Sequence, residues 1–207
     1  MSQQSPAIFI ADSAALDFLN SVATPVDTRV DSIGNGEGLL TWLQQAQLVP
    51  PDVLEAMRRR AKPAELERVA AQARNLREWF RAFVHENKGK PLKASALAEL
   101  EPLNRLLARD EEFGRLVAHK HGKITELNFE RARRWRTPES LLLPIAEALA
   151  RLLAEEDLSD VKACEGATCT LMFADRTRGR TRRWCSMGIC GNRAKQTAHR
   201  HRLKESR

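Results

Sequence analysis

The sequence CEGATCTLMFADRTRGRTRRWCSMGIC, residues 164–190, contains every cysteine of the 207-residue chain. The thiols stand in two pairs, Cys164 with Cys169 and Cys185 with Cys190, with four residues inside each pair and fifteen between the pairs. Paired cysteines at such spacing are typical of a zinc site, because Zn²⁺ binds four thiolates in a tetrahedron. Two disulfides are the alternative, and a reducing cytoplasm disfavours them. We therefore expect one zinc ion in this segment.

A zinc ion with four sulfur ligands has no coordination position left for water or substrate. The expected site is therefore structural, and we do not expect the chain to be an enzyme. Residues 161–207 include few large apolar side chains, so that a hydrophobic core alone would stabilise them weakly. Metal binding can supply the missing free energy of folding.

Positive charge is concentrated in the same part of the chain. Residues 161–207 carry twelve lysines and arginines against three acidic residues, a net charge of +9. The whole chain has a net charge of +7, which leaves −2 for residues 1–160. This asymmetry favours an anionic partner for the C-terminal segment alone, although a merely solvated basic face is the alternative.

The residues around the cysteines predict a small folded module. Residues 170–184 are expected to form a hairpin, and a helix is expected to follow Cys190. On that helix the basic residues share one stripe, whereas Ala194 and Ala198 lie on another face, which could pack on the hairpin. A knuckle, a hairpin and a helix that starts at the last ligand describe a treble-clef finger. Asp175 is expected to pair with Arg182 or Arg183.

A basic helix of this kind can enter the major groove of DNA, which is about 12 Å wide, while arginines before it contact phosphates. The residues expected to contact nucleic acid are Arg178, Arg180, Arg182, Arg183, Arg193, Lys195, Arg200 and Lys204. Arg193 has a second interpretation, in which it donates to carbonyls inside the finger. Structured RNA and an acidic protein partner are the two alternatives to DNA.

Upstream of the finger, apolar residues at three- and four-residue steps predict helices. The expected helices cover residues 14–23, 37–48, 52–60, 63–87, 93–109 and 138–156. Residues 113–136 alternate between apolar and polar, which predicts a β-hairpin with one buried face. That face would consist of Leu116, Ala118, Ile124, Leu127 and Phe129. The expected fold class is α+β: a mainly helical N-terminal domain with a small β element, followed by the treble-clef zinc finger.

Three polar residues of the N-terminal domain are candidates for a small-molecule site. Arg74 and Arg77 are three residues apart, so they share one helix face and could clamp an anion, with Asn20 in the same polar pocket. Interhelical salt bridges are the alternative. No apolar run is long enough to span a membrane, and the N-terminus is not typical of a secretory signal. We therefore expect a cytoplasmic protein without a membrane partner.

The run Arg182-Arg183-Trp184-Cys185-Ser186-Met187, followed by Cys190-Gly191-Asn192-Arg193, resembles the CGNR zinc-finger family. Phe173 and Asp175 also fit that pattern. In this family the finger follows an N-terminal ABATE domain, whose opening the run Ala15-Leu16-Asp17-Phe18-Leu19-Asn20-Ser21 resembles. Two positions depart from the usual pattern, because the family often has Thr in place of Ser21 and Asn in place of Gly179.

The resemblance implies an ABATE-like, ligand-sensing domain over residues 1–157 and a CGNR-type finger over residues 158–207. It also implies a role as a stress-induced transcription regulator that binds DNA. A single finger makes a small footprint on DNA, which favours either a homodimer or cooperation between bound molecules.

Overall fold

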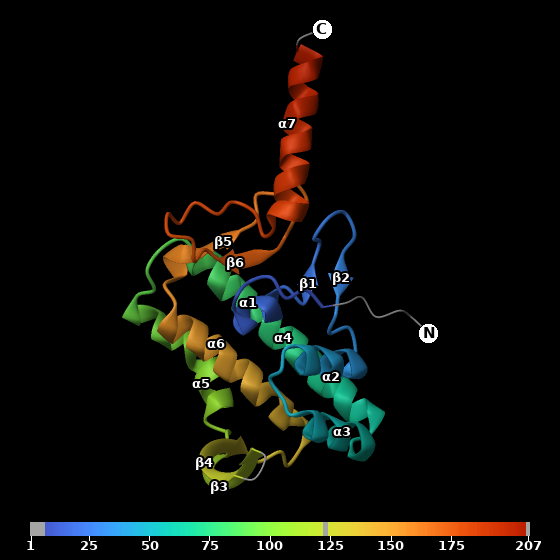
Figure 1. Cartoon of the computed structure of the whole chain (residues 1–207), viewed down its shortest axis with the longest axis vertical. Helices are drawn as coiled ribbons and strands as arrows, with labels where there is room; N and C mark the ends of the chain where they lie inside the picture. Colours follow the sequence, from blue (N-terminus) through green and yellow to red (C-terminus); the bar gives the residue numbers. More distant parts are fainter. Residues whose placement is uncertain (1–6, 122–123, 206–207) are drawn as a thin grey trace.

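The computed structural model describes residues 7–121 and 124–205, and its helices pack around the long helix α4 (Pro63–Asn87) (Figure 1). Pro63 stands in the first turn of α4, where its missing N–H costs nothing. The Glu65 carboxylate accepts a hydrogen bond from the Lys62 amide at 2.7 Å, which closes that turn. One face of α4 is buried through Val69, Ala73 and Phe80, the residues whose spacing predicted the helix.

Shorter elements surround α4. The other helices are α1 (Ala14–Leu19), α2 (Gly36–Gln45), α3 (Pro51–Arg60), η1 (Ala94–Leu100), α5 (Glu101–Leu107), η2 (Pro138–Leu142), α6 (Leu143–Glu155), η3 (Leu158–Asp160), η4 (Met187–Gly191) and α7 (Asn192–Glu205). The strands form three antiparallel pairs, β1 (Val22–Ala23) with β2 (Val30–Asp31), β3 (Glu112–His121) with β4 (Ile124–Arg133), and β5 (Val161–Ala163) with β6 (Met172–Ala174). The α+β class is therefore confirmed.

The core lies where α1 and α2 meet α4 and where α6 packs on the other side of α1. Phe18 and Trp42 are buried there and touch edge to face, with ring centroids 5.5 Å apart. Helix α2 approaches α4 closely because Gly36 has no side chain: a Cβ at this position would lie 2.7 Å from the Leu66 Cβ. No helix in the described part of the chain is long and apolar enough to cross a membrane.

The same core continues into the C-terminal segment. Phe173 on β6 is fully buried in one cluster with the residues of α1 and α4. The Asn20 amide group, at the end of α1, bonds to both backbone groups of Met172: its nitrogen donates to the carbonyl at 2.8 Å, and its oxygen accepts from the N–H at 2.9 Å. Asn20 thus satisfies the outer edge of β6 as a neighbouring strand would, and the finger is joined rigidly to the body.

The expected hairpin of residues 113–136 is present as β3 and β4, but the expectation that one of its faces is buried is wrong. Leu116, Leu127 and Phe129 are 70%, 72% and 71% exposed, and Ala118 is exposed as well. The register places Leu116, Ala118, Leu127 and Phe129 on one face, as expected, but it pairs position 124 with His121 and so excludes it from that face. The hairpin projects from one end of the body instead of lying on it (Figure 1). The Ile124 side chain lies outside the described residues.

Three other expected elements have different bounds. The single helix expected over residues 138–156 is the 3-10 helix η2 followed by α6. The helix expected over residues 14–23 ends at Leu19, because the chain turns there to form β1. The helix expected over residues 93–109 is a 3-10 helix, η1, followed by α5, with Pro102 in the first turn of α5.

Candidate metal centre and nucleic-acid interface

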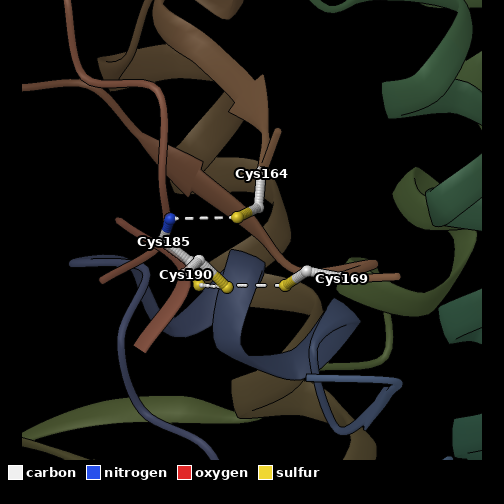
Figure 2. A group of neighbouring side chains, drawn as sticks. All are labelled: Cys164, Cys169, Cys185 and Cys190. Carbon is white, nitrogen blue, oxygen red and sulfur yellow. Dashed lines mark hydrogen bonds between the residues drawn. The ribbon is translucent and has the colours of Figure 1, made fainter. Parts of the chain in front are cut away.

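The four cysteine sulfurs converge on one point, as Figure 2 shows. All four Sγ atoms lie within 4.8 Å of one another. The Sγ atom of Cys185 is 3.8 Å from that of Cys169 and 3.6 Å from that of Cys190. A tetrahedron with Zn–S bonds of about 2.3 Å has edges of roughly 3.8 Å. The cluster therefore fits one structural zinc ion, as the spacing in the sequence predicted.

The first pair of ligands lies on a knuckle between β5 and β6. The Cys164 amide donates to the Leu171 carbonyl at 2.8 Å, which closes the knuckle. The amides of Gly166 and Cys185 point to the Cys164 Sγ atom, at 3.4 and 3.3 Å. Such donors stabilise negative charge on the sulfur. Gly166 packs closely against two ligands, because a Cβ there would lie 3.0 Å from the Cys169 Cβ and 3.1 Å from the Cys190 Sγ atom.

Electrostatics also favours a cation at the centre of the cluster. Hydrogen bonding from the Cys185 thiol lowers the pKa of Cys169 to about 5, while the same contact raises the pKa of Cys185. Burial raises the pKa of Cys190 to about 11. One sulfur therefore ionises readily and makes ionisation of its neighbours harder. A divalent cation removes this conflict because it binds all four sulfurs as thiolates.

The hairpin expected over residues 170–184 is not present, because β6 pairs with β5 and not with residues after it. The chain after β6 is organised by the fully buried carboxylate of Asp175. It accepts from the Lys162 ammonium at 2.7 Å, from the Thr177 hydroxyl at 2.6 Å and from the Arg182 amide at 2.9 Å. The partner of Asp175 is thus Lys162, and the expected pairing with an arginine side chain is wrong. Burial acts to raise the pKa of Asp175, but these donors outweigh it and lower the pKa.

Four of the five arginines in the loop after β6 are engaged within the protein, Arg176 through an ion pair with Glu156. Arg182 stacks over Phe173 at 4.2 Å and donates to the Cys185 carbonyl at 2.5 Å. Arg180 pairs with Asp160 at 3.1 Å, and Arg183 pairs with Glu165 at 2.5 Å. Arg178 is exposed and has no partner in the described part of the chain. Arg182 therefore has mainly a structural role, because its guanidinium binds the second knuckle.

Helix α7 begins directly after the last zinc ligand and projects away from the body (Figure 1). Lys195 and Arg200 are exposed on it. Arg193 is half-buried and has no hydrogen-bonded or ionic partner among the described residues, which leaves its phosphate interpretation in place. The Lys204 side chain lies outside the described residues. The expected packing of the small face is not seen beyond Ala194, because Ala198 is exposed.

The structure shows a contact that the sequence did not indicate. The loop between β1 and β2 touches the first knuckle: the Thr24 amide donates to the Thr170 hydroxyl at 2.8 Å, and the Thr170 amide donates to the Thr24 carbonyl at 3.3 Å. The Pro25 carbonyl oxygen lies 4.0 Å from the Cys190 Sγ atom. The N-terminal part of the chain thus shields the metal cluster. No local pattern could reveal this contact, since the two segments are separated by more than a hundred residues.

The three candidate ligand residues make contacts within the protein. Asn20 holds β6, as described above. Arg74 donates to the carbonyls of Ile33 and Gly34, both at 3.0 Å, and to Glu67. Arg77 is buried and forms two hydrogen bonds to Asp31, each of 2.9 Å. Both guanidinium groups therefore bind the segment that leads from β2 into α2, which corresponds to the salt-bridge alternative.

Family comparisons agree with this arrangement. The family model for ABATE, described as "Putative stress-induced transcription regulator", matches residues 12–156. The chain belongs to the ABATE family. A second model, described as a CGNR zinc finger, matches residues 161–203 of this ABATE protein and includes all four cysteines. No curated protein matches the chain. The two matches and the cysteine cluster support a regulatory role with nucleic acid as the partner.

Proposed function

We propose that this ABATE protein is a cytoplasmic, DNA-binding transcription regulator in which zinc holds the base of helix α7 and α7 contacts DNA. The observation that carries the proposal is the exposure of α7 on all sides from Lys195 to Arg200. A 14-residue helix that packs against so little of its own protein gains little stability from it. Its basic side chains are therefore suited to a partner that surrounds the helix and is negatively charged.

Duplex DNA fits this helix better than duplex RNA does. A helix of 14 residues is about 21 Å long and, with its side chains, 10–12 Å in diameter. The major groove of B-form DNA has about this width, whereas the major groove of A-form RNA is too narrow for side chains to read. The free length of α7 thus supports DNA over the RNA alternative. We also propose a binding role over a catalytic one, since four sulfurs fill the metal's coordination shell.

Charge reversal on α7 should weaken DNA binding strongly. In the double variant Lys195→Glu, Arg200→Glu, affinity for duplex DNA should fall at least tenfold at about 100 mM salt. The slope of log K against log[salt] should decrease in magnitude by roughly 2, since each phosphate contact contributes about 0.9. Fluorescence anisotropy over a series of salt concentrations measures both quantities.

The matched control is Lys90→Glu, Lys93→Glu. It changes the net charge by the same amount, but within residues 1–160 and outside the basic C-terminal segment. Both lysines are exposed and have no ionic partner among the described residues. This variant should bind DNA within about twofold of the wild type. A flat salt response, or equal losses in both variants, would contradict DNA binding through α7. Tighter binding to structured RNA in competition would favour the RNA alternative, and an interaction that survives nuclease would favour the protein adaptor.

We further propose that the helical domain senses a small molecule. A cavity of about 450 Å³ between α3 and residues 135–138 supports this, because it has the size of a ligand site. Trp135 and Met57 provide apolar surface, while Arg60 and Asp52 lie at the rim. A ligand with a flat apolar body and a polar end fits this lining. The cavity differs from the polar pocket expected from the sequence, whose residues make internal contacts.

A ligand of this site should raise the unfolding temperature of the wild type in a screen of small molecules by thermal shift. At a concentration of 100 times its Kd, a ligand stabilises the folded state by about 2.7 kcal/mol. Arg60→Ala should reduce this shift, because Arg60 lines the cavity. Arg59→Ala is the control, since Arg59 is its neighbour on α3 and pairs only with Glu55. Equal shifts in both variants would place the ligand elsewhere.

A further inference from the structure

One face of the β3–β4 hairpin is an exposed apolar surface. The register places Leu116 opposite Phe129 and Ala118 opposite Leu127, so all four side chains lie on the same face of the two strands. Leu116, Leu127 and Phe129 are 70%, 72% and 71% exposed. Together these three side chains present roughly 400 Å² of apolar surface, a size at which a patch marks an interaction site. We call these four residues the hairpin patch.

The Phe129 side chain reaches across to the neighbouring strand. The tip of its ring lies over Gly114, where a Cβ would come within 2.3 Å of the ring. A side chain at position 114 would therefore displace the ring. Glycine at this position leaves room for Phe129 within the hairpin patch.

A hairpin in this position needs a partner. Two strands without a third strand or a covering helix are marginally stable in water. The other face carries Val117 and Ala132, which are half-buried, and Phe113, which is exposed. None of the apolar side chains described for the hairpin is therefore buried in the body. Association through the hairpin patch would give these strands the second layer that they lack.

The charges next to the hairpin patch point to a second copy of this chain. At its base, Arg131 pairs with Glu112 at 3.2 Å, and Arg133 pairs with Asp110 at 2.6 Å. Both arginines are therefore engaged within the protein and offer no free positive charge to nucleic acid or to a strongly acidic protein. A two-fold axis, in contrast, sets apolar side chains against the same apolar side chains and needs no charge complement.

The position of the hairpin fits this partner. Figure 1 shows β3 and β4 at the end of the molecule opposite α7. The C-terminal segment has a net charge of +9, so contacts between two such segments would be repulsive. Contact through the hairpin keeps the two basic helices apart and free. A standard interface buries about 800 Å² on each partner, and the area of the hairpin patch is about half of this. The patch thus has the size of the apolar core of such an interface.

We propose that the hairpin patch is the interface of a homodimer, with Leu127 and Phe129 at its centre. Wild-type protein should sediment as a dimer at about 10 µM in the absence of DNA. In Leu127→Glu, two carboxylates would be buried against apolar side chains, so the dimer Kd should rise at least tenfold. Analytical ultracentrifugation across a concentration series measures this change.

Asn128→Glu is the matched control, because Asn128 is exposed and points to the opposite face of the same strand. This variant should remain dimeric. Circular dichroism should show both variants folded, since neither side chain is buried. A monomeric wild type at 100 µM, or equal dissociation in both variants, would overturn the proposal. The measurement contains no nucleic acid, so its failure leaves DNA binding through α7 untouched.

Discussion

Replacing Cys185 by serine is expected to remove the zinc ion and to unfold the C-terminal segment. Cys185 lies within 3.8 Å of two other ligands and is 2% exposed, so a serine hydroxyl would have to replace a central thiolate. Structural zinc contributes about 10–16 kcal/mol of apparent binding free energy in small fingers. A loss of more than about 5 kcal/mol of stability is therefore expected. Elemental analysis should show the zinc content fall from one ion per chain to near zero.

The loss should extend into the helical domain, because Phe173 and the backbone of Met172 are parts of the shared core. Thermal unfolding of Cys185→Ser should thus begin at a lower temperature for the whole chain, and not only for the finger. Ser186→Ala, beside the ligand, is the control and should keep the zinc and stay within about 0.5 kcal/mol of the wild type. Full zinc occupancy in Cys185→Ser would contradict the four-sulfur site.

Arg77→Ala should be the most destabilising change in the helical domain outside the apolar core. The Arg77 side chain is 3% exposed and donates to both oxygens of Asp31 and to the Ser21 hydroxyl, each at 2.9 Å. Removing one partner of a buried ion pair leaves the other charge uncompensated and typically costs about 3–5 kcal/mol. Chemical denaturation of the two proteins measures the difference.

The effect should depend on pH in a defined direction. Burial acts to raise the pKa of Asp31, but the hydrogen bonds and positive charge of Arg77, together with the Ile33 amide, outweigh it and hold the pKa below its ordinary value. The pair therefore stabilises the fold above the unfolded pKa of about 3.9, and this stabilisation is lost as pH falls through the lower folded pKa. The difference between wild type and Arg77→Ala should be full at pH 7 and shrink below about pH 4.

Arg74→Ala serves as the comparison, because Arg74 lies one turn earlier on α4 and bonds only to two carbonyls and the half-exposed Glu67. Its loss should be about 1 kcal/mol. Equal losses in both variants, or a pH-independent effect of Arg77→Ala, would show that the buried pair is not the cause.

The sequence predicted those features whose physical cause is local. The zinc ligands follow from the chemistry of Cys164, Cys169, Cys185 and Cys190 and from their spacing, since a knuckle needs only a few consecutive residues. Helix α4 follows from a hydrophobic repeat over 25 residues, which no other secondary structure could bury. The concentration of positive charge after residue 160 follows from counting the charged residues of the sequence.

Tertiary structure decided what depends on which segments meet. Asn20, expected in a ligand pocket, instead satisfies the edge of β6, and Arg182, expected on DNA, stacks on Phe173. A polar side chain of either kind has the same sequence signature whether its partner is a ligand or a distant strand, because hydrogen-bonding capacity is the same in both cases. The alternation of β3 and β4 likewise fixed which residues share a face. Whether that face is covered depended on where the rest of the chain packs, and the fold leaves Leu127 and Phe129 exposed.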